Sequence, residues 1–93
     1  MYKLITSKKF EKDYKKSLKR GLPIEKLDEA MRILRKTGSL PVKYRPHKLT
    51  GNYAGMWECH IDGRNSDWLM VWAQNDDELT LLMLRTGSHS DIF

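Results

Sequence analysis

The three histidines are the residues of this sequence best suited to proton-transfer chemistry. His47, His60 and His89 all fall in the second half of the chain, each beside a predicted strand or loop. An imidazole titrates near neutral pH, so it can accept or donate a proton under cellular conditions. Arg85 and the segment Thr86-Gly87-Ser88-His89 directly follow a predicted strand, which brings a guanidinium and a histidine to one end of a sheet. This pairing suits chemistry on a phosphate.

Metal-free cleavage of RNA is the phosphate reaction that these side chains could perform. It requires a base that removes the ribose 2'-hydroxyl proton, an acid that protonates the leaving oxygen, and cations that stabilise the charge of the phosphorane. Histidine, aspartate and arginine cover those roles. A lone histidine near a strand is usually solvated or structurally satisfied, so the interpretation depends on several histidines occurring together.

The segment from Met56 to Ile61 predicts the direction in which one histidine points, because side chains alternate along a strand. The polar face carries Glu58, His60 and Asp62, and the other face carries Trp57, Cys59 and Ile61. The apolar set should pack against helices. His60 is therefore expected on the open side of the sheet, where a base or an acid could meet a substrate.

A zinc site is a weaker alternative. Its ligands would be His47, Cys59, His60 and Asp67, but adjacent strand residues point to opposite faces, and no recognised spacing of zinc ligands is present. Cys59 is expected to be buried filler among apolar residues and not a nucleophile. As the single cysteine of the chain it cannot form an internal disulfide, which favours a cytoplasmic location.

Seventeen Lys and Arg residues against twelve Asp and Glu residues give a net charge of +5, so polyanions are the natural partners. A modest positive excess also serves solubility alone. The lysines between residues 8 and 20 could be a solvated helical face or could grip phosphates. With 93 residues the chain is expected to form one domain over 1–93. No stretch approaches the ~20 apolar residues that cross a bilayer, so membrane insertion is not expected.

Hydrophobic periodicity predicts a strand and two helices in the first half of the chain. Residues 2–6 alternate as a short strand, and Ser7 could cap the helix that follows and ends at Gly21. The apolar stripe of that helix is Phe10, Tyr14 and Leu18. A second helix should begin near Ile24 and end near Gly38, with its stripe at Ile24, Leu27, Met31 and Leu34.

The second half of the chain predicts an antiparallel meander. A short edge strand is expected near Lys48 and Leu49, followed by strands over residues 56–61, 68–73 and 79–84. Turn signals stand at Asp62-Gly63 and Asn75-Asp76-Asp77. The predicted class is α+β, with two roughly antiparallel helices on one face of a small, mostly antiparallel sheet and the other face left partly open.

Several short motifs match a known family. They are Tyr44-Arg45-Pro46-His47-Lys48-Leu49, Gly51, Gly55, Trp57-Glu58-Cys59-His60-Ile61, Asp67-Trp68 and Arg85-Thr86-Gly87-Ser88-His89. Together they resemble the YafQ-like branch of the RelE/ParE toxin superfamily, and the match spans nearly the whole chain. The predicted order of strand, two helices and meander is also similar to that fold.

The resemblance implies a type II toxin that enters the decoding site of the ribosome, cleaves messenger RNA there and is neutralised by a cognate antitoxin. No cofactor or metal is expected, and promoter DNA would be bound only through the antitoxin complex. The site implied by the resemblance has two parts. Its catalytic residues are His47, His60, Asp67 and His89, and its substrate-binding or phosphate-binding residues are Arg85, Lys48 and Phe93.

The division of roles stays open at this stage. His60 or Asp67 would deprotonate the 2'-hydroxyl, His89 would protonate the leaving oxygen, and His47 with Arg85 would steady the phosphate. The segment Asp62-Gly63-Arg64-Asn65-Ser66 is longer than the usual family turn, so Asp62 is an alternative to Asp67. The competing functions are a non-catalytic member of the superfamily, such as a gyrase-binding toxin, and a general RNA-binding module.

Overall fold

The computed structural model describes residues 1–62 and 67–93, and the order of its elements confirms the predicted one. In chain order the elements are β1 (Lys3–Thr6), α1 (Lys8–Lys19), α2 (Ile24–Thr37), the 3-10 turn η1 (Val42–Tyr44), β2 (His47–Lys48), the 3-10 turn η2 (Gly51–Tyr53), β3 (Trp57–His60), β4 (Leu69–Asn75), β5 (Thr80–Gly87) and α3 (His89–Ile92). The short terminal helix α3 was not predicted.

The strands form one mixed sheet in the order β1-β5-β4-β3-β2. The meander from β2 to β5 is antiparallel as predicted, whereas β1 pairs with β5 in parallel. The β4–β5 register shifts by one residue, because Trp72 faces Met83 while Val71 faces Arg85 and leaves Leu84 without a partner. Such a bulge changes the face to which the following side chains point.

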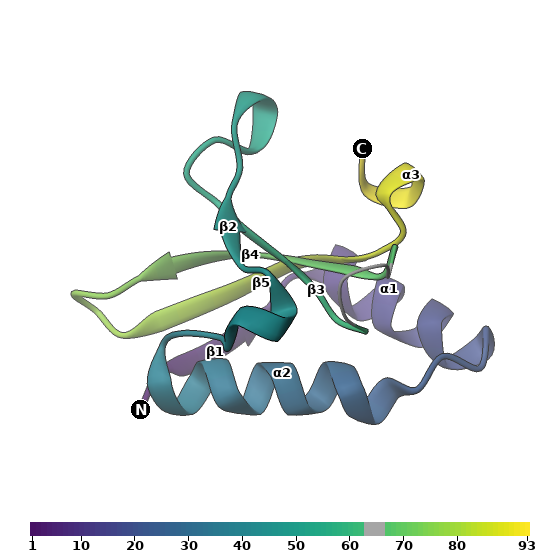
Figure 1. The fold of residues 1–93 in the computed structure, drawn as a ribbon, viewed down its shortest axis with the longest axis horizontal. Coiled ribbons are helices and arrows are strands. Elements are labelled where there is room, and N and C mark those ends of the chain that lie inside the picture. The colour runs from purple at the N-terminus through teal and green to yellow at the C-terminus, as the bar shows by residue number, and fades with distance from the viewer. Residues whose placement is uncertain (63–66) are drawn as a thin grey trace.

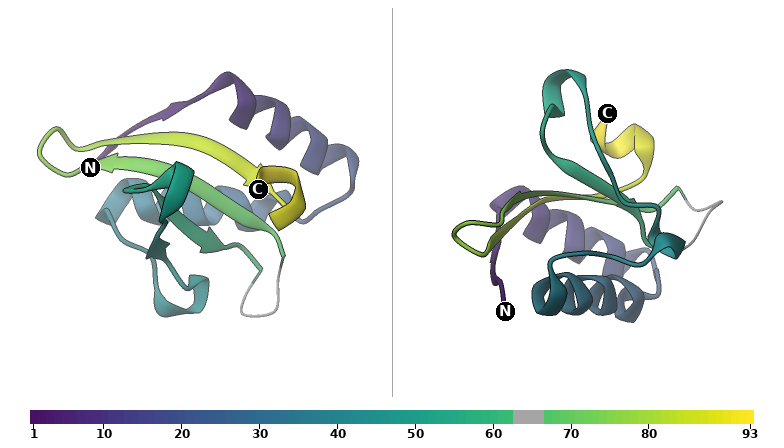
Figure 2. Two further views of the ribbon diagram at one scale, coloured as in Figure 1. Left: turned by 90° about the horizontal axis from the view of Figure 1, so that it is seen from above. Right: turned by 60° about the vertical axis from the view of Figure 1, so that its left-hand side comes forward.

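The helices α1 and α2 cover one face of the sheet, as Figures 1 and 2 show. The main core lies between them and includes Phe10, Leu27, Leu34, Trp72 and Met83, each at most 1% exposed. On the opposite face rise α3 and the segment of β2 and η2. A smaller cluster of Leu69, Val71 and Ile92 lies there, packed against Leu49, Tyr53, Met56 and Leu84. The face expected to be partly open is covered in part by these segments.

The buried stripe of α1 differs from the predicted one. The Ser7 side chain caps the helix by accepting from Phe10 N–H at 3.1 Å, as expected. Leu18, however, is 49% exposed, while Ser17 is only 3% exposed. Helical geometry accounts for the difference, since at 3.6 residues per turn Leu18 lies about 80° from Phe10 around the axis and Ser17 only about 20°. The true stripe reaches Ser17 through the intermediate residues Asp13 and Tyr14.

The predicted end of α2 at Gly38 is confirmed. Gly38 adopts a left-handed conformation with φ 79°, and its N–H donates to the Leu34 carbonyl. A Cβ at this position would lie 2.5 Å from the Tyr2 ring, so the site requires glycine both for its backbone angle and for the approach of β1. Leu27, Ala30 and Leu34 are the fully buried residues of the helix.

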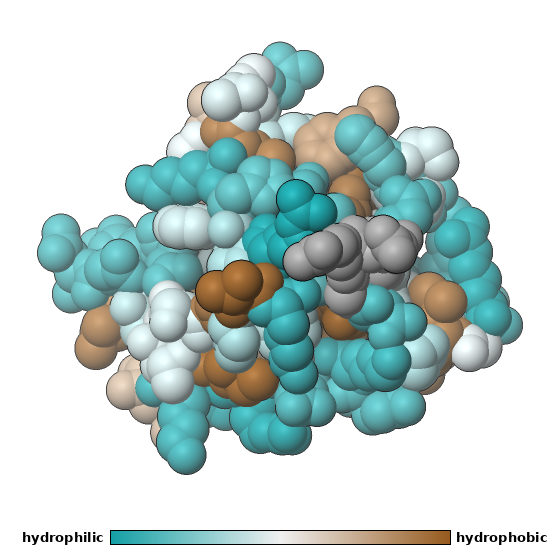
Figure 3. All heavy atoms as spheres, in the orientation of Figure 1, coloured by the Kyte–Doolittle hydropathy of each residue, from teal (hydrophilic) through white to brown (hydrophobic). Residues whose placement is uncertain are grey.

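The face of the molecule seen in Figure 3 is mostly hydrophilic, with hydrophobic residues in small separate groups. Every lysine of α1 is exposed, so the predicted basic face of that helix is present. None of the helices in the described part of the chain is long and apolar enough to cross a membrane.

Candidate active site

Two of the three predicted histidines meet on the sheet face opposite α1 and α2. His47 in β2 stands beside Glu58 in β3, and the His47 and His60 ring centroids are 6.4 Å apart. Cys59 on the other face is fully buried in the main core. The alternation of β3 thus confirms that His60 faces away from the helices and Cys59 towards them. Burial raises the pKa of the Cys59 thiol, which fits the expectation of an inert core residue.

Glu58 holds His47 in a defined orientation. The Glu58 carboxylate lies 3.3 Å from Nε2 of His47, and the Arg45 carbonyl lies 3.1 Å from Nδ1. Both ring nitrogens therefore face acceptors, and only the doubly protonated imidazolium donates to both. Arg45 reaches this position through a left-handed backbone conformation, φ 49°, just before Pro46. The arrangement places His47 next to a 7% exposed glutamate and fixes the orientation of its ring.

The third histidine, His89, is the first residue of α3, where it is exposed and contacts Phe93. The ring centroids of His89 and Phe93 are 5.0 Å apart, and those of Phe93 and Tyr53 are 5.2 Å apart in a T-shaped contact. Tyr53, in η2, thus joins the segment after β2 to the C-terminal helix. The structure brings the predicted residues His89 and Phe93 together, and adds Tyr53, which the sequence did not single out.

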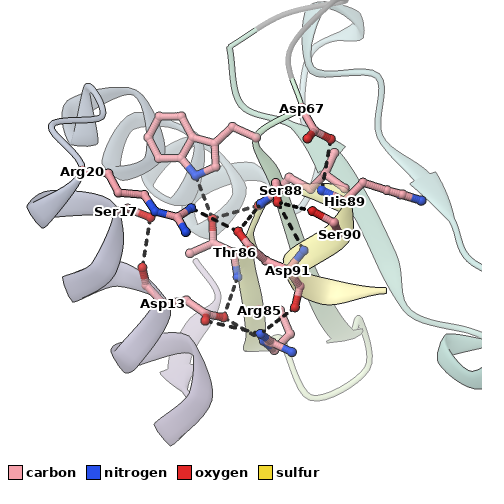
Figure 4. A network of polar contacts seen from close by, with 12 residues as sticks. Asp13, Ser17, Arg20, Asp67, Arg85, Thr86, Ser88, His89, Ser90 and Asp91 are labelled. Atoms are coloured by element: carbon pink, nitrogen blue, oxygen red, sulfur yellow. Dashed lines mark hydrogen bonds and ion pairs between the residues drawn. The ribbon is translucent and has the colours of Figure 1, made fainter.

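Asp67 lies at the start of α3, although it precedes β4 in the chain. Its carboxylate accepts from the backbone N–H of His89 at 3.0 Å, as Figure 4 shows. A carboxylate at a helix N-terminus satisfies an unpaired amide. Asp67 is therefore placed to orient His89. The strand register also relates His60 to the segment before His89, because His60, Leu69 and Gly87 lie side by side on β3, β4 and β5. Two strand spacings separate the His60 and Gly87 backbones by roughly 10 Å.

Asp62 does not share the face of His60, so that prediction is wrong. The β3 strand ends at His60, and although Ile61 still packs in the main core as predicted, the alternation of side chains is lost at Asp62. The Asp62 carboxylate instead forms a short ion pair with Lys26 on α2. The turn residues 63–66 lie outside the described residues. Of the two candidate aspartates, Asp67 is the one that contacts another predicted site residue.

Arg85 is turned towards α1 and does not contact His47. Its Nε donates to Asp13 Oδ2 at 2.7 Å, and its Nη2 donates to the Asp91 carbonyl at 3.3 Å. The hydrogen bond to Asp13 is the main reason that the pKa of Arg85 is raised, with a smaller contribution from Tyr53. Three strand spacings, roughly 14 Å, separate the Arg85 and His47 backbones. The two residues are therefore not placed to grip one phosphate oxygen together.

Lys48 lies on the other face of the sheet. It stands opposite Trp57 in the β2–β3 register, and its ammonium is 5.6 Å from the centroid of the Trp57 ring. Trp57 packs against the main core beside Trp72. The structure thus separates Lys48 from the histidines, because neighbouring residues of a strand point to opposite faces.

The helix that carries His89 is held by a capping box. Ser88 accepts from Asp91 N–H, and the Asp91 carboxylate accepts from Ser88 N–H at 3.0 Å and pairs with Arg20 at 3.2 Å. These hydrogen bonds, Ser88 first, lower the pKa of Asp91 to about 2. Gly87, with φ 153°, makes room for the carboxylate, since a Cβ there would lie 3.1 Å from it.

We expect acid to weaken this capping box. Because the pKa of folded Asp91 is about 2 and that of an unfolded aspartate is about 3.9, its stabilisation is present above pH 4 and is lost as the pH falls towards 2. At pH 6, Asp91→Asn should lower the urea midpoint by roughly 0.5 M. At pH 2.5 the difference from the wild type should have mostly disappeared. Asp77→Asn, in the exposed β4–β5 turn, is the control; a gap that stays constant with pH would contradict the assignment.

Three contacts of the site were missed, and only one left a signal in the sequence. Asp13 occupies a polar position on the buried stripe of α1, three residues after Phe10 and four before Ser17, which marks a carboxylate that needs a partner. Glu58 shares the predicted face of His60, but its neighbour His47 depends on the strand register. Tyr53 lies in a loop without any periodic pattern.

Comparison with known proteins supports one class. Residues 2–93 match the family described as "Bacterial toxin of type II toxin-antitoxin system, YafQ". The chain is 32% identical over 88 residues to the mRNA interferase toxin YafQ of Escherichia coli K12, covering 94% of this chain and 90% of that protein.

Solved structures of related toxins share the fold. A metal-bound toxin from Helicobacter pylori is 36% identical with a TM-score of 0.86, and the match covers 100% of both chains. The toxin-antitoxin complex DinJ-YafQ of Escherichia coli gives 30% identity and a TM-score of 0.85, covering 99% of this chain and 97% of that one.

The fold and these matches define a toxin of a type II toxin-antitoxin system. Within that class the chain belongs to the YafQ family, and it is homologous to an mRNA interferase.

Proposed function

We propose that this protein is a ribosome-dependent, metal-independent endoribonuclease that cleaves messenger RNA in the decoding site and so stops translation. The observation that supports it most directly is the arrangement of His47, His60 and His89 with Phe93 on one face of the sheet. The 32% identity to an mRNA interferase supports the same activity. Metal-free cleavage needs an acid, a base and a cation, and these side chains provide all three.

In the proposed mechanism His60 is the base that removes the 2'-hydroxyl proton. His47, oriented by Glu58 and the Arg45 carbonyl, stabilises the charge of the phosphorane. His89 is the acid that protonates the leaving 5' oxygen, and Asp67 orients it through the backbone of α3.

Phe93 and Arg85 would position the substrate beside this acid. Phe93 is 53% exposed and contacts His89, so its ring is available for stacking on a base. Arg85 supplies the nearby cation at the end of β5. Lys48, which lies on the other face, has no role in this mechanism.

An antitoxin is the proposed protein partner, and the cytoplasm the proposed location. A relative has been solved as the DinJ-YafQ complex. With a net charge of +5, this chain should attract an acidic antitoxin segment that folds on binding, and ribosomal RNA when it is free. Promoter DNA would be contacted only through the antitoxin complex. The whole of 1–93 would act as one domain.

The experiment that tests the function is the mapping of cleavage of a translated message by purified protein. We expect cuts within codons when ribosomes are present and none in the same naked message. The double variant His60→Ala/His89→Ala should give no cuts and should not stop growth. Growth arrest that survives this double substitution would support a binding-only toxin, including the gyrase-binding alternative, while affinity for RNA without cuts would support the RNA-binding module.

Metal independence is tested in a separate experiment, since the Helicobacter pylori relative was solved with metal bound. Among the described residues, no group of three or more His, Cys, Asp or Glu side chains is arranged to hold a metal ion. Ribosomes themselves need Mg²⁺, so the toxin is treated with EDTA and desalted before it is mixed with them. Full activity of the stripped protein is expected. A loss that added zinc or copper reverses would contradict metal independence.

A further inference from the structure

The carboxylate of Asp13 joins α1 to the end of β5 (Figure 4). Its Oδ2 accepts from Arg85 Nε at 2.7 Å and from the Thr86 backbone N–H at 3.1 Å, and its Oδ1 lies 3.4 Å from Arg85 Nη2. The side chains of Arg85 and Asp13 are 20% and 14% exposed. One helix residue thus receives donors from two consecutive residues of the strand that leads into the site.

The sheet topology explains why a carboxylate lies at this position. The edge strand β1 pairs with β5 only as far as Met83, while β5 continues to Gly87. The last residues of β5 therefore lack a neighbouring strand on that side. The chain turns from β1 into α1 at Ser7, and the buried stripe of α1 brings Asp13 against the uncovered edge. Its carboxylate satisfies the Thr86 N–H that β1 does not reach.

The same contacts fix the plane of the Arg85 guanidinium. Nε and Nη2 are both engaged by Asp13, and Nη2 also donates to the Asp91 carbonyl of α3 at 3.3 Å. Arg85 therefore links α1 with the helix that begins at His89. A guanidinium held on two sides loses little conformational entropy when a phosphate binds. Arg85 is therefore preorganised for phosphate binding.

We propose that Asp13 is a positioning residue for cleavage, which holds Arg85 and α3 in the geometry where the guanidinium and His89 address the same phosphate. The proposal rests on the proposed function and deepens it, since nothing else assigns Asp13 a part in the reaction. Asp13 acts through Arg85 and does not touch the substrate. Its effect must therefore disappear when Arg85 is absent.

The test compares Asp13→Asn, Asp13→Glu and the control Asp28→Asn in ribosome-dependent cleavage, well below the melting temperature of each variant. Asp28, on α2, also joins the two helices by accepting from Tyr14, whereas the carboxylate that Arg85 contacts is Asp13 on α1. We expect Asp13→Asn to lower kcat about 10- to 100-fold with little change in KM. Asp13→Glu should restore part of the rate, and Asp28→Asn should cleave like the wild type.

Two further measurements separate positioning from a merely structural role. In an Arg85→Ala background, Asp13→Asn should cause no additional loss of kcat. The Nε–Hε signal of Arg85 in ¹H–¹⁵N NMR spectra should be sharp and slow to exchange in the wild type and broadened in Asp13→Asn. A wild-type rate in Asp13→Asn would overturn the proposal. So would a double variant in which the loss of kcat from Asp13→Asn adds in full to the loss from Arg85→Ala. If the wild-type protein itself does not cleave on ribosomes, the proposed function fails, and an unchanged Arg85 signal in Asp13→Asn separately overturns the positioning role.

Discussion

Replacing His89 with alanine is expected to lower the rate of ribosome-dependent cleavage by about 10² to 10⁴-fold, the usual contribution of a general acid. His89 is exposed at the first position of α3, so the substitution leaves the core untouched. His89→Phe should be equally inactive, because it keeps a ring against Phe93 but cannot transfer a proton. Single-turnover cleavage on programmed ribosomes measures the chemical step.

The pH–rate profile distinguishes proton transfer from substrate positioning. Loss of the acid should remove the alkaline limb of the wild-type profile in both His89 variants. Ser90→Ala, one residue further along α3, is the control and should retain both the rate and the profile. If the alkaline limb persists in His89→Ala, the proton comes from another group.

His60→Ala is expected to cause a loss of similar size, about 10² to 10⁴-fold, and to remove the acidic limb of the profile. His47→Ala should lower the rate by a smaller factor and keep that limb. The reason is geometric, since both nitrogens of His47 face acceptors, the Glu58 carboxylate and the Arg45 carbonyl. A ring with both nitrogens engaged in this way can steady the phosphate but is poorly placed to accept the 2'-hydroxyl proton.

Glu58→Gln provides the matched variant for this assignment. It keeps the size of the side chain but removes the charge that faces His47 at 3.3 Å. We expect a moderate fall in rate with the acidic limb intact. The reverse result, in which His47→Ala abolishes the acidic limb and His60→Ala retains it, would exchange the roles of the two rings.

The helices and strands could be predicted because their signals are local. Ser7 and Gly38 mark helix ends through their own side chain and backbone conformation, and both predictions are confirmed. The burial of Leu18 was predicted wrongly, since a repeat of four residues drifts around a helix of 3.6 residues per turn. The parallel pairing of β1 with β5 joins residues at opposite ends of the chain, and no local pattern encodes it.

The sheet face to which each site side chain points could be predicted only inside regular strands. His60 and Cys59 follow the alternation of β3, whereas Asp62 lies just beyond the end of that strand and pairs with Lys26. Contacts such as that of Asp13 with Arg85 connect residues 72 positions apart. They depend on which edge of β5 the first helix covers, which is a property of the assembled sheet.

The unpaired Leu84 of β5 keeps Arg85 on the face away from the helices. If β5 ran through Leu84 without the bulge, strict alternation would carry Arg85 to the side of Met83, under the helices, and every residue from there to α3 would change sides with it. A charged guanidinium would then be forced into an apolar layer. Deleting Leu84 would instead place Arg85 directly after Met83, where regular alternation still turns it away from the helices, so homologues of this toxin can lack the extra residue without changing the side on which the arginine lies.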